Sequence, residues 1–244
     1  MNKQCLKANF TFHRLNMLPG LLIFWGVMGL VLGIFTLLNT HPRISVGVFM
    51  TSSAGGDKVS MIASLFLAIV IYTIVVAVSS HSENFSLLTG MGSSRKAYYL
   101  SFITSLAMVS LLNATVMTLG FMLEKAVLPM LGLQQLDYLA VYSQQFNNIM
   151  LTMVHFFLLT LISSFFVMVS AYFYRSPNKA VHLLIFAAIM ITLFTGDLRS
   201  GIWGNLLDWM TNNTNAITLS GKLLLLSLVF YSTGWLLVRK SEAR

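Results

Sequence analysis

Six long stretches without a charged residue make up most of this chain of 244 residues. A helix needs about 20 mostly apolar residues to cross the hydrocarbon core of a bilayer. The first four stretches exceed that length, and the fifth and sixth are shorter. The sequence therefore predicts a single-domain, all-α integral membrane protein (residues 1–244) with six transmembrane helices. We expect these spans at residues 19–38, 59–80, 98–122, 149–173, 180–196 and 219–238.

The charged residues are divided unequally between the two sides of these spans. If the N-terminus is cytoplasmic, the inner segments hold two carboxylates, Glu83 and Glu242, against ten cations. The outer segments hold five cations and five carboxylates. Because Lys and Arg are retained on the cytoplasmic side of short loops, we expect both termini to be cytoplasmic. The inner cations are Lys3, Lys7, Arg14, Arg95, Lys96, Arg175, Lys179, Arg239, Lys240 and Arg244.

The composition argues against a soluble or nucleic-acid-binding protein. Hydrophobic residues form 57% of the chain and charged residues only 9%, whereas a soluble domain carries roughly 25% charge. The formal net charge is +8, but the cations stand in small groups at helix ends and form no continuous basic face. Anionic lipid headgroups explain this distribution better. Membrane lipids are therefore expected partners, and nucleic acid is not.

Two flanking segments carry further expectations. Residues 1–18 place apolar and basic residues near helical spacing, which suits an amphipathic helix on the inner leaflet or, equally, a plain basic flank. The apolar run that follows is longer than the core of a signal peptide, so we interpret it as a retained span. Residues 201–210 contain Trp203 and Trp209, and tryptophan concentrates at the membrane interface. We expect an interfacial or re-entrant outer segment there, after the fifth helix.

Several kinds of chemical site are missing from the sequence. There is no G-x-x-x-x-G-K-[ST] motif, so the chain does not bind ATP through a P-loop of its own. There is also no H-E-x-x-H or C-x-x-C pattern, and Cys5 is the only cysteine. No span carries an ionisable Asp, Glu, Lys or Arg in its middle, as an ion-driven carrier usually would. We therefore expect no enzyme activity, metal or cofactor in this chain.

A few polar side chains remain inside the predicted spans. Asn113 and Thr118 lie in the third span, and His155 lies near the outer end of the fourth. Such side chains either form hydrogen bonds between packed helices or contact a substrate. Packing is the favoured interpretation for Asn113 and Thr118, and a satisfied histidine at the membrane interface is the favoured one for His155. A substrate path is the alternative for all three.

The segment between the second and third spans is the most distinctive part of the chain. Ser82 can cap a short helix with Glu83 in its first turn, and Gly90 can end it. Ser93 or Ser94 can then cap the third span. This pattern predicts a short cytoplasmic helix that offers Glu83 and Phe85 to the cytosol. The simpler alternative is a tight helical turn with basic anchors.

This segment resembles the intracellular loop of ABC-2-type permeases, the membrane subunits of bacterial ABC exporters. In that family the loop often reads Glu-Asn-Phe, some apolar residues, then Gly-x-Ser-Arg-Arg and an aromatic residue. Lys96 replaces the second Arg here, which keeps the charge but loses the planar fork. The close match covers only this segment, although the six-span layout is also similar. It consists of Glu83-Asn84-Phe85, Gly90 or Gly92, Ser94-Arg95-Lys96 and Tyr98-Tyr99.

The resemblance implies a membrane subunit in the bacterial cytoplasmic membrane. It would pair with a separate ATPase, and that ATPase would hold ATP and Mg²⁺. A second permease subunit would complete a homo- or heterodimer. The exported substrate would be amphipathic or hydrophobic: a peptide, a drug or a lipid-linked molecule. The alternatives are a substrate-binding subunit of a vitamin uptake system, a membrane enzyme, and a non-transporting immunity or sensor protein. The residues implied in coupling to the ATPase are Glu83, Asn84, Phe85, Leu88, Arg95 and Lys96.

Overall fold

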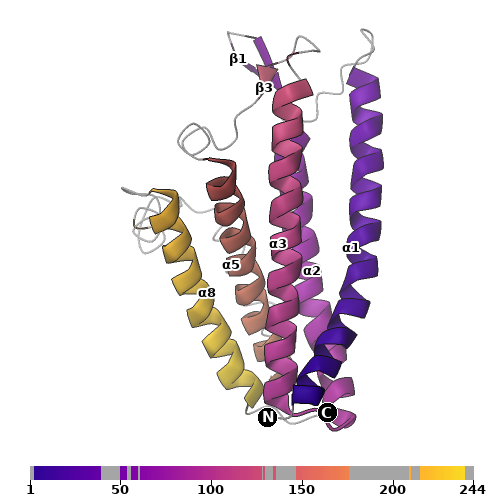
Figure 1. The fold of residues 1–244 in the computed structure, drawn as a ribbon, viewed down its shortest axis with the longest axis vertical. Helices are drawn as coiled ribbons and strands as arrows, with labels where there is room; N and C mark the ends of the chain where they lie inside the picture. The colour runs from indigo at the N-terminus through magenta and orange to yellow at the C-terminus, as the bar shows by residue number, and fades with distance from the viewer. Residues whose placement is uncertain are drawn as a thin grey trace.

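The computed structural model describes residues 3–39, 50–53, 56–59, 61–127, 129, 134–135, 147–175, 209 and 215–239. Five long helices form its framework (Figure 1). Each of the five contains an apolar stretch long enough to cross a membrane, which is the architecture of a multi-pass membrane protein. The helices are α1 (Lys3–Asn39), α2 (Met61–Gly90), α3 (Arg95–Val127), α5 (Asn148–Arg175) and α8 (Ala216–Arg239).

Five of the six expected spans coincide with these helices. The expected fifth span, residues 180–196, lies outside the described residues, as does most of the outer segment at 201–210. Trp209 is described, and Lys222 of α8 lies beside it. The Lys222 ammonium donates a hydrogen bond to the Trp209 carbonyl and lies 5.0 Å from the centroid of its ring. This contact anchors the first turns of α8 by a cation–π interaction.

The N-terminal segment is part of the first long helix and does not form a separate element. We expected a boundary between residues 18 and 19, but α1 continues through Pro19. An interior proline removes one backbone hydrogen bond and bends a helix, and the lower part of α1 leans toward α3 (Figure 1). Its buried face packs into the bundle and repeats every four residues, at Asn9, His13, Met17 and Leu21.

One end of the bundle collects most of the described cations, and we call it the cation-rich end. The first residues of α1 and α3 lie there together with the last residues of α2, α5 and α8 (Figure 1). A hydrogen bond of 2.9 Å from Arg95 Nη1 to the Arg239 carbonyl joins the ends of α3 and α8. The described cations at this end are Lys3, Lys7, Arg14, Arg95, Lys96, Arg175 and Arg239.

The opposite end carries a small sheet and charges of both signs. Strands β1 (Met50–Ser53) and β2 (Gly56–Val59) form an antiparallel hairpin, and β3 (Gln134–Gln135) pairs in parallel with β2. The sheet lies beside the end of α3 (Figure 1). Asp57 and Lys58 lie in β2, and Glu124 and Lys125 lie in the last turns of α3. The sequence analysis did not predict this sheet.

Helices α5 and α8 run in the same direction and pack along their length. Near the start of both helices, Val154 belongs to the same apolar cluster as Leu219 and Leu223. Further along, the hydroxyls of Ser163 and Tyr231 lie 3.0 Å apart. Two neighbouring parallel helices must be joined by a connection that returns from one end of the bundle to the other. Residues 176–214 make that connection.

Candidate functional site

The segment that connects α2 and α3 lies at the cation-rich end, and we call residues 91–94 the α2–α3 turn. Helix α2 runs without interruption to Gly90, so the predicted separate short helix is wrong. No proline or glycine precedes Gly90 within α2, and a serine such as Ser82 is tolerated inside a helix. The stretch that resembles the family loop is therefore the last turns of α2 and the start of α3.

The end of α2 is a Schellman motif. Ser93 N donates to Leu88 O at 2.9 Å, and Gly92 N donates to Thr89 O at 3.1 Å. Gly92 has a φ of 87°, a left-handed conformation that glycine adopts without a steric penalty. Helix α2 thus ends at Gly90, as expected, and Gly92 is the left-handed residue that closes the motif.

Two serines fix the geometry of the α2–α3 turn. The prediction that Ser93 or Ser94 caps the third span is confirmed for Ser94, whose Oγ accepts a 3.2 Å hydrogen bond from Ala97 N. Ser93 has another role, because its Oγ accepts a 2.5 Å hydrogen bond from Asn9 Nδ2 of α1. Cys5 Sγ also contacts Ser93 Oγ, at 3.8 Å. The N-terminal part of α1 therefore holds the turn from the side.

Phe85 is buried in an aromatic cluster that joins four helices, so the prediction that it faces the cytosol is wrong. Its ring packs edge-on against Tyr98 of α3 and Tyr174 of α5, with ring centroids 5.2 Å apart in both pairs. His13 of α1 packs 5.3 Å from Tyr98, and Phe102 stacks on Tyr98 at 5.8 Å. The aromatic cluster thus consists of His13, Phe85, Tyr98, Phe102 and Tyr174.

The other side of the end of α2 presents an apolar surface that the sequence analysis did not identify. Asn84 and Leu88 are buried with Phe85, and the side chain of Glu83 lies outside the described part of the chain. Leu87 is 49% exposed and Met91 is 76% exposed. Their spacing of four residues could have indicated this apolar surface, because residues four apart lie on one face of a helix.

The two predicted coupling cations play different parts. The Arg95 guanidinium caps the C-terminus of α8 through the Arg239 carbonyl, a position where a cation also interacts favourably with the helix dipole. Lys96 is exposed at the same end. Arg95 is thus an internal anchor of the bundle, and Lys96 is available to a partner.

The three predicted polar residues of the spans are all buried between helices. Asn113 Oδ1 accepts a 3.0 Å hydrogen bond from Trp25 Nε1 of α1. Thr118 Oγ1 accepts one of 3.1 Å from Thr152 of α5. His155 is buried in α5, one helical turn beyond Thr152. These contacts match the packing interpretation, and a substrate path through them would require α1, α3 and α5 to separate.

A groove of about 380 Å³ lies between α3 and α8 near the cation-rich end. Lys96 lies at one end of the groove. Tyr99 also lines the groove, and its hydroxyl donates a 2.6 Å hydrogen bond to the Tyr231 carbonyl. Its volume falls within the range of about 300–1,000 Å³ that is usual for small-molecule sites. The lining residues are Lys96, Tyr99, Leu100, Ile103, Leu228, Tyr231, Ser232, Trp235 and Leu236.

Among the described residues, no group of three or more His, Cys, Asp or Glu side chains is placed to hold a metal ion. Comparison with known proteins gave no match to a family model, to a curated protein or to a solved structure. The features that bear on function are therefore the sequence of the α2–α3 segment and the geometry described above.

Proposed function

We propose that this chain is the membrane subunit of an ATP-driven exporter of the ABC-2 type, located in a bacterial cytoplasmic membrane. A separately encoded ATPase binds at the cation-rich end and supplies ATP and Mg²⁺, and a second permease subunit completes the transporter. The observation that carries the proposal is the α2–α3 turn. Leu87 at the end of α2 and Met91 in the turn are exposed apolar side chains, and Lys96 is exposed at the start of α3. The sequence that resembles the family loop spans the same segment.

The geometry of the turn suits the transmission of a mechanical displacement. A capped helix end with a Schellman motif has few ways to deform locally. Phe85 ties this end to α3 and α5, and Ser93 ties it to α1. A push on Leu87 or Met91 by a partner therefore moves several helices together. Closure of an ATPase dimer upon ATP binding is a source of such a push.

The direction of the helices supports six spans. Both α5 and α8 end at the cation-rich end, so the chain between them has to cross back (Figure 1). The apolar residues 180–196 are the stretch available for that crossing. Six spans also return both termini to the cytoplasm, as the distribution of Lys and Arg requires.

The groove between α3 and α8 favours a second candidate function. A groove of this volume with Lys96 at one end and Trp235 along its side suits a small amphipathic ligand. The substrate-binding subunit of a vitamin uptake system would hold its ligand in such a site. Co-purification of a small molecule, lost in a Trp235→Ala variant, would favour this function over export.

Affinity purification from the native membrane tests the export proposal. We expect an ATPase to be captured with the protein, and we expect Met91→Glu to reduce its yield at least tenfold because the charge prevents burial of this side chain. Met91→Leu is the matched control and should retain the ATPase. Absence of an ATPase from the unmodified protein would overturn the proposed function. Equal capture by Met91→Glu would overturn the role of the α2–α3 turn.

A further inference from the structure

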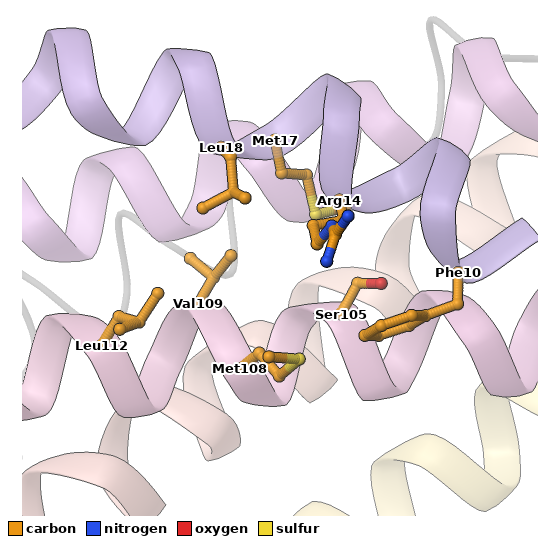
Figure 2. Close-up of a pocket in the computed structure, with 8 residues that line it drawn as sticks. All are labelled: Phe10, Arg14, Met17, Leu18, Ser105, Met108, Val109 and Leu112. Carbon is orange, nitrogen blue, oxygen red and sulfur yellow. The ribbon is translucent and has the colours of Figure 1, made fainter. Parts of the chain in front are cut away.

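A second groove runs between α1 and α3, and one of the side chains that line it, Arg14, is positively charged. Figure 2 shows Phe10, Arg14, Met17 and Leu18 on α1 facing the lining residues of α3 across a narrow gap. The groove has a volume of about 50 Å³, which is too small to enclose a drug-sized ligand. The α3 side consists of Ser105, Met108, Val109 and Leu112.

Arg14 is the only charged residue that lines this groove. It lies roughly 16 Å along α1 from Lys3, at a rise of 1.5 Å per residue, and it precedes the expected span at residues 19–38, near the edge of the apolar part of α1. An arginine does not lose its proton in a protein. A permanent charge at this depth has to find an anion or water.

No side chain of the groove neutralises Arg14. The lining contains no carboxylate, and Ser105 Oγ donates its proton to the Ser101 carbonyl. Glu124, the only acidic residue of α3, lies roughly 28 Å further along that helix from Ser105. The Arg14 side chain points into the gap between the helices (Figure 2), and it is exposed there. An anion that pairs with Arg14 would therefore come from outside the groove lining.

We propose that the α1–α3 groove binds an anionic glycerophospholipid of the leaflet at the cation-rich end. The phosphate accepts hydrogen bonds from the Arg14 guanidinium, whose planar fork fits two phosphate oxygens at once. One acyl chain lies along Leu18, Val109 and Leu112. Lys7 lies on the same face of α1, seven residues before Arg14, and its exposed ammonium adds to the attraction of an anionic headgroup.

The two halves of the groove match the two halves of such a lipid. Phe10 and Arg14 lie toward the cation-rich end of α1, and Leu18 and Leu112 lie toward the bilayer interior. Because α1 and α3 both begin at the cation-rich end, the polar and apolar parts of the groove follow the direction of the membrane normal. The proposal requires only that the chain spans a membrane, so it stands or falls independently of an ATPase partner.

Native mass spectrometry of the full chain, released from nanodiscs of equal parts phosphatidylglycerol and phosphatidylcholine, tests the proposal. We expect the unmodified protein to retain one phosphatidylglycerol in preference to phosphatidylcholine. Arg14→Gln should lower the retained phosphatidylglycerol at least fivefold. Arg239→Gln removes the same charge from an exposed side chain at the same end that lines neither groove, and it should leave retention unchanged. Equal retention of the two lipids, or an equal loss in both variants, would overturn the proposal.

A second pair of variants tests the apolar half without touching a charge. Leu112→Trp fills the groove, whereas Leu111→Trp places the same side chain at the neighbouring position, which is exposed but does not line the groove. We expect only Leu112→Trp to lower lipid retention. If both variants retain the lipid like the unmodified protein, no acyl chain lies in the groove.

Discussion

Gly234 is a position where α8 packs tightly against Tyr99 of α3. A Cβ atom at this position would lie 2.7 Å from the Tyr99 hydroxyl. That hydroxyl cannot move freely, because Tyr99 is buried and donates to the Tyr231 carbonyl at 2.6 Å. The absence of a side chain at Gly234 therefore allows a hydrogen bond between two helices that are far apart in sequence.

We predict that Gly234→Ala destabilises the protein by about 1–3 kcal/mol, the usual cost of overpacking. Gly221→Ala is the control on the same helix, because a Cβ there meets no atom within 4 Å. It should be neutral or slightly stabilising, since alanine is the better helix former. Thermal unfolding of both variants in the same detergent measures the difference. Equal midpoints would show that the Tyr99 contact is not rigid.

The burial of Phe85 leads to a second prediction at this scale. Phe85→Ala removes a ring that contacts Tyr98 and Tyr174 and leaves a cavity, and it should cost roughly 3–5 kcal/mol. Leu87→Ala, on the exposed face of the same turn of α2, should change stability by less than about 0.5 kcal/mol. Unfolding midpoints and the yield of folded protein test this pair. A stable Phe85→Ala protein would contradict the aromatic cluster as a structural joint.

At the scale of the element, the α2–α3 turn depends on one backbone conformation. Gly92 has a positive φ, so Gly92→Ala should cost about 1–2 kcal/mol for a left-handed alanine. Gly90→Ala lies two residues earlier, inside the helix, where a Cβ meets no atom within 4 Å. It should be tolerated. Hydrogen exchange of the backbone amides at positions 92 and 93 reports on the turn, and only Gly92→Ala should accelerate this exchange.

The same element shows what the sequence could and could not predict. The Ser94 cap depends on residues that are neighbours in the chain, so local pattern was enough to find it. The burial of Phe85 depends on Tyr174, which belongs to a helix much later in the chain, and no local pattern carries that information. The predicted break at Ser82 was wrong because capping residues permit a helix to start but do not force one to end.

For the spans, too, local properties of a segment were predictable from the sequence and contacts with distant segments were not. Long uncharged stretches predicted five helices that the structure contains, because length and apolarity are properties of the segment itself. The continuation of α1 through Pro19 depends on packing of Asn9, His13 and Met17 against the bundle, which outweighs the preference of proline for a helix start. For Asn113 and Thr118, the residue type indicated a polar contact, but the partners Trp25 and Thr152 emerged only from the fold.

At the scale of the whole molecule, the arrangement of helix ends predicts which residues face the cytoplasm. In a Cys5→Ser background, single cysteines introduced at Ser176 and Ser241 should react with a membrane-impermeant maleimide only after the cells are opened. Cysteines at Ser53 and Gln144 should react in intact cells. The reason is that the distribution of Lys and Arg predicts a cytoplasmic location for the cation-rich end. Labelling of the Ser241 position in intact cells would contradict the six-span topology.

The parallel contact between α5 and α8 also has a consequence for biosynthesis. A ribosome releases α5 well before α8, so for a time the face of α5 that carries Val154 and Ser163 has no helix beside it. The Tyr99 hydroxyl likewise lacks its carbonyl acceptor until Tyr231 has been made. In a nascent chain that stops before Ala216, the face of α5 that packs against α8 would stay exposed to lipid and to membrane proteases. Entry of the last helix is therefore the step that closes the described bundle.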